Sequence, residues 1–203
     1  MLEQLRVKFR TKPITIRNLD QIFLPLWVIA TAISYAGGGR ISAFVTDYIT
    51  GDLGVCLSFM VMSIAIALAQ WLVIRKYISG MGWLWTTIIG GTMGGALSSW
   101  ASFQLAIIYG NAVDLLTIYV CLRGLSTGLM QWAIIRPYFR RAEWWMVGTT
   151  ASWYIGVMVG ISLVDKLGYF LTLAIGAIYG LLTGCVLLVL FRISRDHRNV
   201  HTF

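Results

Sequence analysis

The chain has 203 residues, of which 58% are hydrophobic and only 12% are charged, and its formal net charge is +8. A soluble domain carries about twice this charged fraction, so the composition excludes an ordinary soluble fold and predicts an integral membrane protein. The positive charge is typical of a basic cytoplasmic face beside anionic lipid headgroups, and nucleic acid is not expected as a partner.

Six apolar stretches follow one another along the chain. Most of them reach the roughly 20 residues that a helix needs to cross the hydrocarbon core of a bilayer. The first stretch is the shortest, because Gly37-Gly38-Gly39 and Arg40 interrupt it. The sequence predicts an all-α fold with six transmembrane helices, near Ile22–Ala36, Leu53–Ile74, Trp83–Ile108, Leu115–Ile135, Trp144–Val164 and Tyr169–Phe191.

The cations predict the orientation of these helices. Most of the 16 Lys and Arg residues flank the predicted helices on one side, which the positive-inside rule identifies as cytoplasmic. Both termini are therefore expected in the cytoplasm, as a basic N-terminal segment (1–20) and a C-terminal tail (193–203), on either side of a membrane domain (21–192).

A hairpin unit is repeated three times in the sequence of the membrane domain. An apolar stretch ends in Gln-Trp-x-x-x-Arg and the next begins on Trp; a third, degenerate copy ends at Arg192. Repeats of two crossings enter the membrane in the same orientation and are related by an axis along the membrane normal. The fold is therefore predicted as three tandem two-helix repeats (about 21–76, 83–141 and 144–192) in a pseudo-threefold bundle.

The repeated motif has the residues of a membrane boundary. Trp and Arg four residues apart share one helix face, where the ring can settle at headgroup level beneath the guanidinium. The Gln one turn further in requires a hydrogen-bond partner from a neighbouring helix or a ligand. The expected interface anchors are Gln70, Trp71, Arg75, Trp83, Trp132, Arg136 and Trp144.

Small residues form a second pattern. Glycines at four-residue spacing, such as Gly124 with Gly128, predict close approach of helix backbones. Cys56, Cys121 and Cys185 all lie in apolar helices and are interpreted as small buried hydrophobic residues.

Arg123 is the one residue that packing does not explain, because it falls inside a predicted helix. An intramembrane cation is costly and indicates a functional site or a structural ion pair. Its candidate acidic partners are Asp114 on the same helix and the aspartates of the outer loops. The candidate ligand-binding residues are Arg123, Gln104, Tyr119, Gln131 and Asp114.

Catalytic and metal-binding patterns are not found. His197 and His201, the only histidines, lie in the predicted C-terminal tail, and the sequence has no His-Glu-x-x-His motif or phosphate-binding glycine loop. We therefore expect no metal, no cofactor and no enzymatic activity.

The Gln-Trp-x-x-[Leu/Ile]-Arg motif, followed by Trp and a glycine-rich helix, resembles that of small multi-pass membrane proteins of cyanobacteria and related bacteria. Residues 70–95 and 131–160 carry the resemblance. It implies a multi-pass protein of a bacterial cytoplasmic membrane or a thylakoid membrane, and it implies no particular activity.

Two functions are favoured over a third, an intramembrane enzyme, which has no catalytic residue pattern to support it. The first is a non-catalytic accessory or scaffold subunit, whose partners are anionic lipids and a larger membrane complex or further copies of the chain. The alternative is a small transporter or solute-binding protein with an anion site at Arg123. Arg123 pointing into the bundle, with an open path to the outer face, favours the alternative; a sealed ion pair favours the scaffold.

Overall fold

The computed structural model describes residues 16–78 and 81–200, and within these ranges every regular element is a helix. Most of the predicted N-terminal segment lies outside the described residues. The long helices are α2 (Ile16–Tyr48), α3 (Gly51–Ile74), α4 (Gly82–Tyr109), α5 (Leu115–Ile135), α6 (Trp144–Ser162) and α8 (Leu171–Val200). Short helical turns fill the connections: η1 (Gly110–Ala112), α7 (Val164–Leu167) and η2 (Gly168–Phe170).

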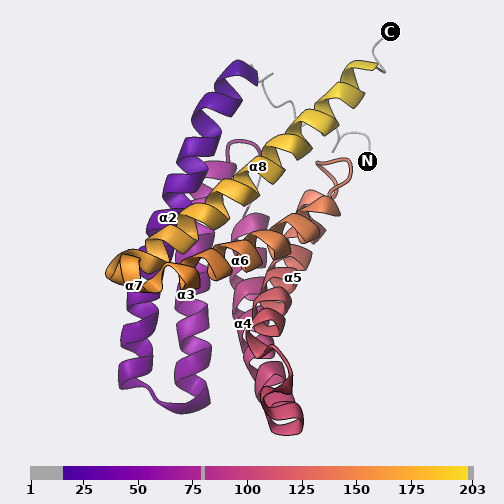
Figure 1. Cartoon of the computed structure of the whole chain (residues 1–203). Helices are drawn as coiled ribbons and strands as arrows, with labels where there is room; N and C mark the ends of the chain where they lie inside the picture. The colour runs from indigo at the N-terminus through magenta and orange to yellow at the C-terminus, as the bar shows by residue number, and fades with distance from the viewer. Residues whose placement is uncertain (1–15, 79–80, 201–203) are drawn as a thin grey trace.

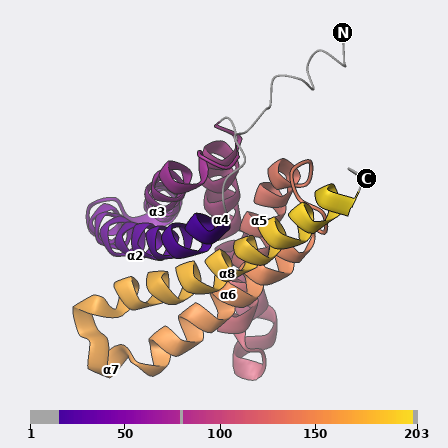
Figure 2. The ribbon, with the colours of Figure 1, turned by 90° about the horizontal axis from the view of Figure 1, so that it is seen from above.

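The six long helices form a closed ring. Each packs against its two neighbours in the order α2, α3, α4, α5, α6 and α8, and α8 returns to α2 (Figures 1 and 2). The first and last described segments lie at one end of the bundle, with the connections 75–81 and 136–143; we call this the terminal end. The turns that join α2 to α3 and α4 to α5 lie at the opposite, distal end, whereas the turn that joins α6 to α8, with α7, lies at the side of the bundle nearer its middle.

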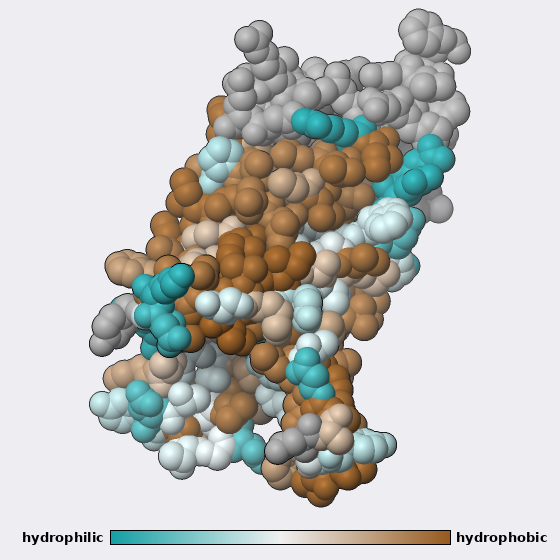
Figure 3. All heavy atoms as spheres, viewed as in Figure 1, coloured by the Kyte–Doolittle hydropathy of each residue, from teal (hydrophilic) through white to brown (hydrophobic). Residues whose placement is uncertain are grey.

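The chain is a membrane-embedded protein by the length and composition of its helices. Four helices, α2, α3, α5 and α8, are long and apolar enough to cross a bilayer. Helices α4 and α6 have 28 and 19 residues and are rich in Gly, Ser, Thr and Trp, which lowers their hydropathy. Apolar side chains cover the middle of the face in Figure 3.

Three predicted helix bounds are wrong, and the first is the start of α2, which begins at Ile16 rather than near Ile22. Helix α2 does not end near Ala36 but continues through the three glycines to Tyr48. Glycine is tolerated there because its small size lets α2 and α3 pack closely. A Cβ on Gly38 would lie 2.9 Å from the Cβ of Ala65. Helix α8 likewise runs on to Val200, so the predicted tail from residue 193 is helical over most of its length.

The two connections at the terminal end are built alike. The amides of Tyr77 and Ile78 bond to the carbonyl of Ile74, and the amides of Tyr138 and Phe139 bond in the same way to that of Ile135. Both connections therefore begin with the same tight turn.

They differ in length by one residue, since the first spans 75–81 and the second 136–143. Arg141, in the second, has a φ of 60°, the left-handed conformation that a non-glycine residue adopts only at some cost. The extra residue changes the register of the next helix, so that Trp145 rather than Trp144 takes the place of Trp83. Trp144 is 55% exposed, whereas Trp145 is 1% exposed.

Three tryptophans meet inside the ring near its terminal end. The ring centroids of Trp27 and Trp83 lie 5.8 Å apart and those of Trp83 and Trp145 lie 5.5 Å apart, both edge to face. Trp83 was expected as an interface anchor, but it is 1% exposed, because this apolar contact buries the whole indole. With Phe23, Ile74, Ile78, Ile135, Phe139, Ala142, Leu187, Leu188 and Leu190 they form a buried apolar cluster, which we call the plug.

Glycines bring the helix backbones together, as their spacing predicts. A Cβ on Gly124 would lie 2.8 Å from the Cα of Thr150, and one on Gly128 would lie 3.1 Å from the Cα of Met146. The prediction for the cysteines is wrong: Cys56 and Cys185 are exposed, because they lie on outward faces of α3 and α8, and Cys121 is half-buried.

Candidate functional site

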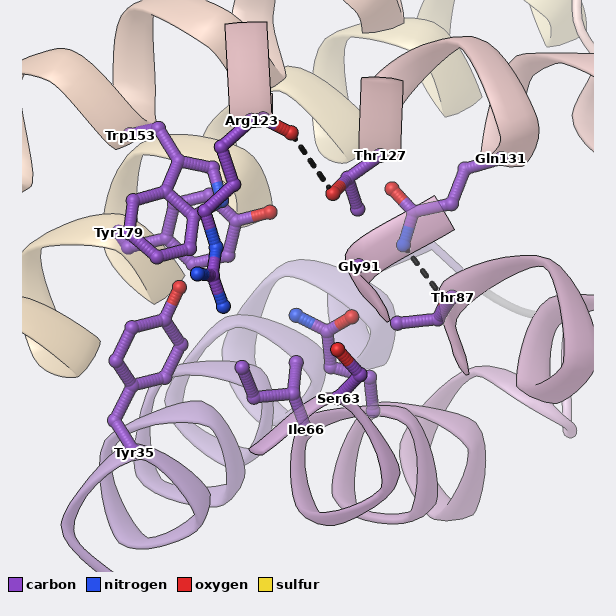
Figure 4. Close-up of a pocket in the computed structure, with 11 residues that line it drawn as sticks. Tyr35, Ser63, Ile66, Thr87, Gly91, Arg123, Thr127, Gln131, Trp153 and Tyr179 are labelled. Atoms are coloured by element: carbon purple, nitrogen blue, oxygen red, sulfur yellow. Dashed lines mark hydrogen bonds between the residues drawn. The ribbon is translucent and has the colours of Figure 1, made fainter. Parts of the chain in front are cut away.

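A small cavity lies on the axis of the ring, on the distal side of the plug. All six long helices contribute to its wall (Figure 4). Its water-accessible volume is about 20 Å³, enough for a water molecule but not for an organic group. The lining residues are Tyr35, Ser63, Ile66, Gln70, Thr87, Gly91, Arg123, Thr127, Gln131, Trp153 and Tyr179.

Arg123 is the charged residue of this cavity and is 5% exposed. It lies eight residues into α5, about 12 Å from the distal end of that helix at 1.5 Å per residue. Its Nη1 donates a hydrogen bond to the Tyr119 hydroxyl at 2.8 Å. The guanidinium also lies 4.6 Å from the ring centroid of Phe59 and 5.1 Å from that of Trp153.

No carboxylate lines the cavity among the described residues. The candidate partner Asp114 instead caps the N-terminus of α5, where its carboxylate accepts bonds from the amide of Thr117 at 3.1 Å and from its hydroxyl at 2.6 Å. These two bonds, the hydroxyl bond first, lower the pKa of Asp114. Asp114 therefore stabilises the helix terminus and does not pair with Arg123. The aromatic rings and the hydroxyl group around Arg123 carry no charge that would neutralise the guanidinium.

Two further polar atoms in the cavity wall have no protein partner. They are the hydroxyl of Tyr35 and Oε1 of Gln70, on side chains that are 2% and 1% exposed. A guanidinium has five N–H donors, and one of those of Arg123 is bonded to Tyr119. In Figure 4 its tip is directed toward the space beside Tyr35. These two groups are therefore able to bond to a water or a ligand in the cavity.

An open cleft adjoins this cavity toward the distal end. Its volume is about 340 Å³, within the range of small-molecule sites. Arg123 and Trp153 line both the inner cavity and the cleft, so they stand at the junction between them. Figure 3 shows the distal end hollowed between the ends of the hairpins. The other lining residues are Gly39, Ser42, Ala43, Thr46, Ser58, Phe59 and Met62.

The predicted ligand residue Gln131 is occupied by helix contacts. Its Nε2 donates to Thr87 Oγ1 at 2.8 Å, and its Oε1 accepts from Trp145 Nε1 at 3.0 Å. Gln70 occupies the corresponding position on α3, yet its Oε1 and Trp83 Nε1 are both unpartnered. On α8, in the third hairpin, Leu187 occupies this position, and Trp27 Nε1 of α2 donates instead to Thr183 Oγ1, one helical turn before Leu187, at 3.0 Å.

The other predicted residues fall into two groups. Tyr119 holds Arg123, whereas Gln104, half-buried on α4, lines neither cavity. The expected Trp and Arg pairs are confirmed as contacts: Arg75 lies 5.0 Å from the Trp71 ring centroid and Arg136 lies 5.4 Å from that of Trp132. Within the described residues no cluster of His, Cys, Asp or Glu could hold a metal ion.

Sequence reasoning missed the aromatic residues around the guanidinium, Tyr35, Phe59, Trp153 and Tyr179. A usable signal existed for two of them. Tyr35 and Trp153 each lie eight residues after a buried tryptophan, Trp27 and Trp145, and therefore occupy the same level of the ring. The sequence prediction assigned Trp144 instead of Trp145 to the buried position, so the equivalence of Trp153 to Tyr35 was not recognised.

No family model matches the chain, and no curated protein or solved structure shows significant similarity to it. Its function is therefore inferred from the geometry of the site.

Proposed function

We propose that the chain is a small solute-binding membrane protein, acting as a transporter, that binds an anionic group at Arg123. The observation that carries the proposal is a buried guanidinium at the inner end of an open cleft, with no carboxylate in the cavity wall among the residues that the structure describes. A cation inside a membrane helix costs about 2.5 kcal/mol or more, and an anionic ligand offsets that cost.

The arrangement of the plug and the cleft also supports this function. The cleft gives access from the distal end, while the plug of tryptophan and aliphatic side chains closes the terminal end. A site that is open to one side and closed to the other is the geometry expected of one state in alternating access.

The proposed membrane topology has six crossings in three hairpin repeats around a pseudo-threefold axis. The closed ring of six helices supports it, as do the similar connections at the terminal end. Helices α4 and α6 lie between more apolar helices, so their glycines and hydroxyl groups are placed at helix contacts. The positive-inside rule supports a cytoplasmic position for both termini, with the distal cleft facing outward.

The accessory-subunit function is supported only by the apolar outer surface of the bundle. Large apolar side chains such as Trp100 and Phe103 are more than 60% exposed. Contact with lipid requires the same surface, so it does not favour a protein partner. The bacterial membrane assignment and the resemblance to cyanobacterial multi-pass proteins remain part of the proposal.

Native mass spectrometry of the protein released gently from its own membrane tests this function. We expect a bound small anion, and we expect Arg123→Leu to lose it while keeping its helical circular dichroism. Lys166→Leu removes a cation from the exposed helix α7, outside both cavities, and should keep the anion. A stoichiometric protein partner with no Arg123-dependent small molecule would indicate the accessory subunit instead.

A further inference from the structure

The chemistry of the cleft wall restricts the solute, and this inference rests on the proposed function. We infer that the site takes an organic monocarboxylate: a single carboxylate head bound to Arg123, with an apolar or aromatic body lying in the cleft.

One charge is available to the head group. Arg123 is the only charged residue in either cavity wall of the described structure. Phosphate sites combine several cations with free backbone amides at helix N-termini. Arg123 and Tyr35 lie well inside their helices, where the backbone amides are already bonded. A single guanidinium matches one carboxylate, which it can bind through two parallel N–H bonds.

The size of the two cavities fixes how the solute lies. The inner cavity, at about 20 Å³, has room for a water molecule beside Tyr35 and Gln70 but not for an organic group. The body of the solute therefore has to extend from Arg123 into the cleft of about 340 Å³.

The cleft wall has few groups that can bind a polar body. Its three hydroxyl groups donate to backbone carbonyls: Ser42 to Ser58 at 2.7 Å, Thr46 to Ala43 at 2.8 Å and Ser58 to Val55 at 2.8 Å. With their protons used in this way, these hydroxyl groups offer a solute acceptors but no donors.

The remaining surface of the cleft is apolar. Phe59, Met62 and Trp153 provide rings and a thioether, and none of the described residues that line the cleft has a carboxylate to pair with an ammonium group. A sugar would lose hydrogen bonds to water in this cleft, and an amino acid would bury an unpaired ammonium. An apolar or aromatic body has neither cost.

Isothermal titration calorimetry on the full chain in phosphatidylcholine nanodiscs tests the inference with a matched pair of probes. 3-Phenylpropanoate and L-phenylalanine differ by the α-ammonium. We expect 3-phenylpropanoate to bind and phenylalanine to bind at least about a hundredfold more weakly, because its ammonium has no partner. Acetate, which has the head but no body, should bind at least about tenfold more weakly. Inorganic phosphate should not compete.

Variants tie the binding to the site. Arg123→Leu should abolish binding of 3-phenylpropanoate. Ala43→Trp adds bulk to the cleft wall and keeps the guanidinium of Arg123; it should also abolish binding, which keeps the test valid if the Arg123 variant does not fold. Ala151→Trp, on an exposed position of α6 outside the cleft, is the matched control and should bind normally. Loss of binding in Ala151→Trp alone would overturn the assignment of the cleft.

A fatty carboxylate from the membrane has the same chemistry as a soluble aromatic carboxylate, and laurate distinguishes the two sources. Displacement of 3-phenylpropanoate by laurate at a lower concentration supports an acyl carboxylate; weaker displacement supports a soluble one. Arg123-dependent binding of phosphate or phenylalanine as tight as that of 3-phenylpropanoate would overturn the monocarboxylate inference and leave the proposed anion site intact. Arg123-independent binding of every probe would overturn both.

Discussion

Two buried threonines, Thr31 and Thr183, have the same burial but different hydrogen bonding. Both are 0% exposed. Thr183 Oγ1 accepts from Trp27 Nε1 at 3.0 Å and donates to the carbonyl of Tyr179 at 2.7 Å, whereas Thr31 Oγ1 has no partner. We expect Thr183→Val to lower the free energy of unfolding by about 1–3 kcal/mol, because it leaves a buried indole donor without an acceptor.

Thr31→Val is the control with the same change of shape. It removes a buried hydroxyl that has no partner, so the free energy of unfolding should stay the same or rise. Unfolding titrations in mixed micelles, followed by circular dichroism, measure both variants. Equal destabilisation by the two would show that the bond from Trp27 contributes nothing specific.

Arg123 could be found from the sequence because a charge within an apolar stretch is conspicuous. Its environment could not be found in the same way. Phe59 and Trp153 are ordinary aromatic residues of apolar helices, and only the fold brings them within 4.6 and 5.1 Å of the guanidinium. Asp114 was considered as a partner from its charge alone, and the structure places it at a helix terminus bonded to Thr117.

At the scale of the helix, glycines set how closely neighbouring elements pack. A Cβ on Gly124 would lie 2.8 Å from the Cα of Thr150, so α5 and α6 would have to separate. We expect Gly124→Ala to lower the free energy of unfolding by about 1–3 kcal/mol, as overpacking does in other cores. Unfolding in mixed micelles again provides the measurement.

Gly37→Ala is the matched substitution in α2, where a Cβ would meet no atom within 4 Å. It should raise the free energy of unfolding by about 0.5–1 kcal/mol, since alanine loses less backbone entropy in a helix. A loss of stability at Gly37 as large as that at Gly124 would contradict the role of close helix contacts.

The segments that form helices were easier to predict than the register of a helix relative to the preceding repeat. The bounds of α5 match the predicted stretch at both ends, because its apolar residues are bounded by Asp114 and Arg136. The register of α6 was predicted one residue off. Trp144 and Trp145 are adjacent, and the sequence alone does not show that the second connection is one residue longer than the first.

At the scale of the whole molecule, the number of crossings is the feature to test. In a chain with all three native cysteines replaced by alanine, single cysteines at the exposed positions Lys76, Asp114, Arg140 and Asp165 report the side of the membrane. A membrane-impermeant maleimide should label the positions 76 and 140 from one side and 114 and 165 from the other. Labelling of 76 and 114 from the same side would mean that α4 does not cross.

Arg123 is not equally accessible from the two ends of the ring of helices. Arg123 has an open cleft toward the distal end, whereas the plug separates it from the terminal end. Water in the cleft would carry little of the membrane voltage, so most of the electric field would fall across the plug. An anion would then reach Arg123 almost without electrical work, and its onward passage past the tryptophans would cost or release about 2.3 kcal/mol per 100 mV.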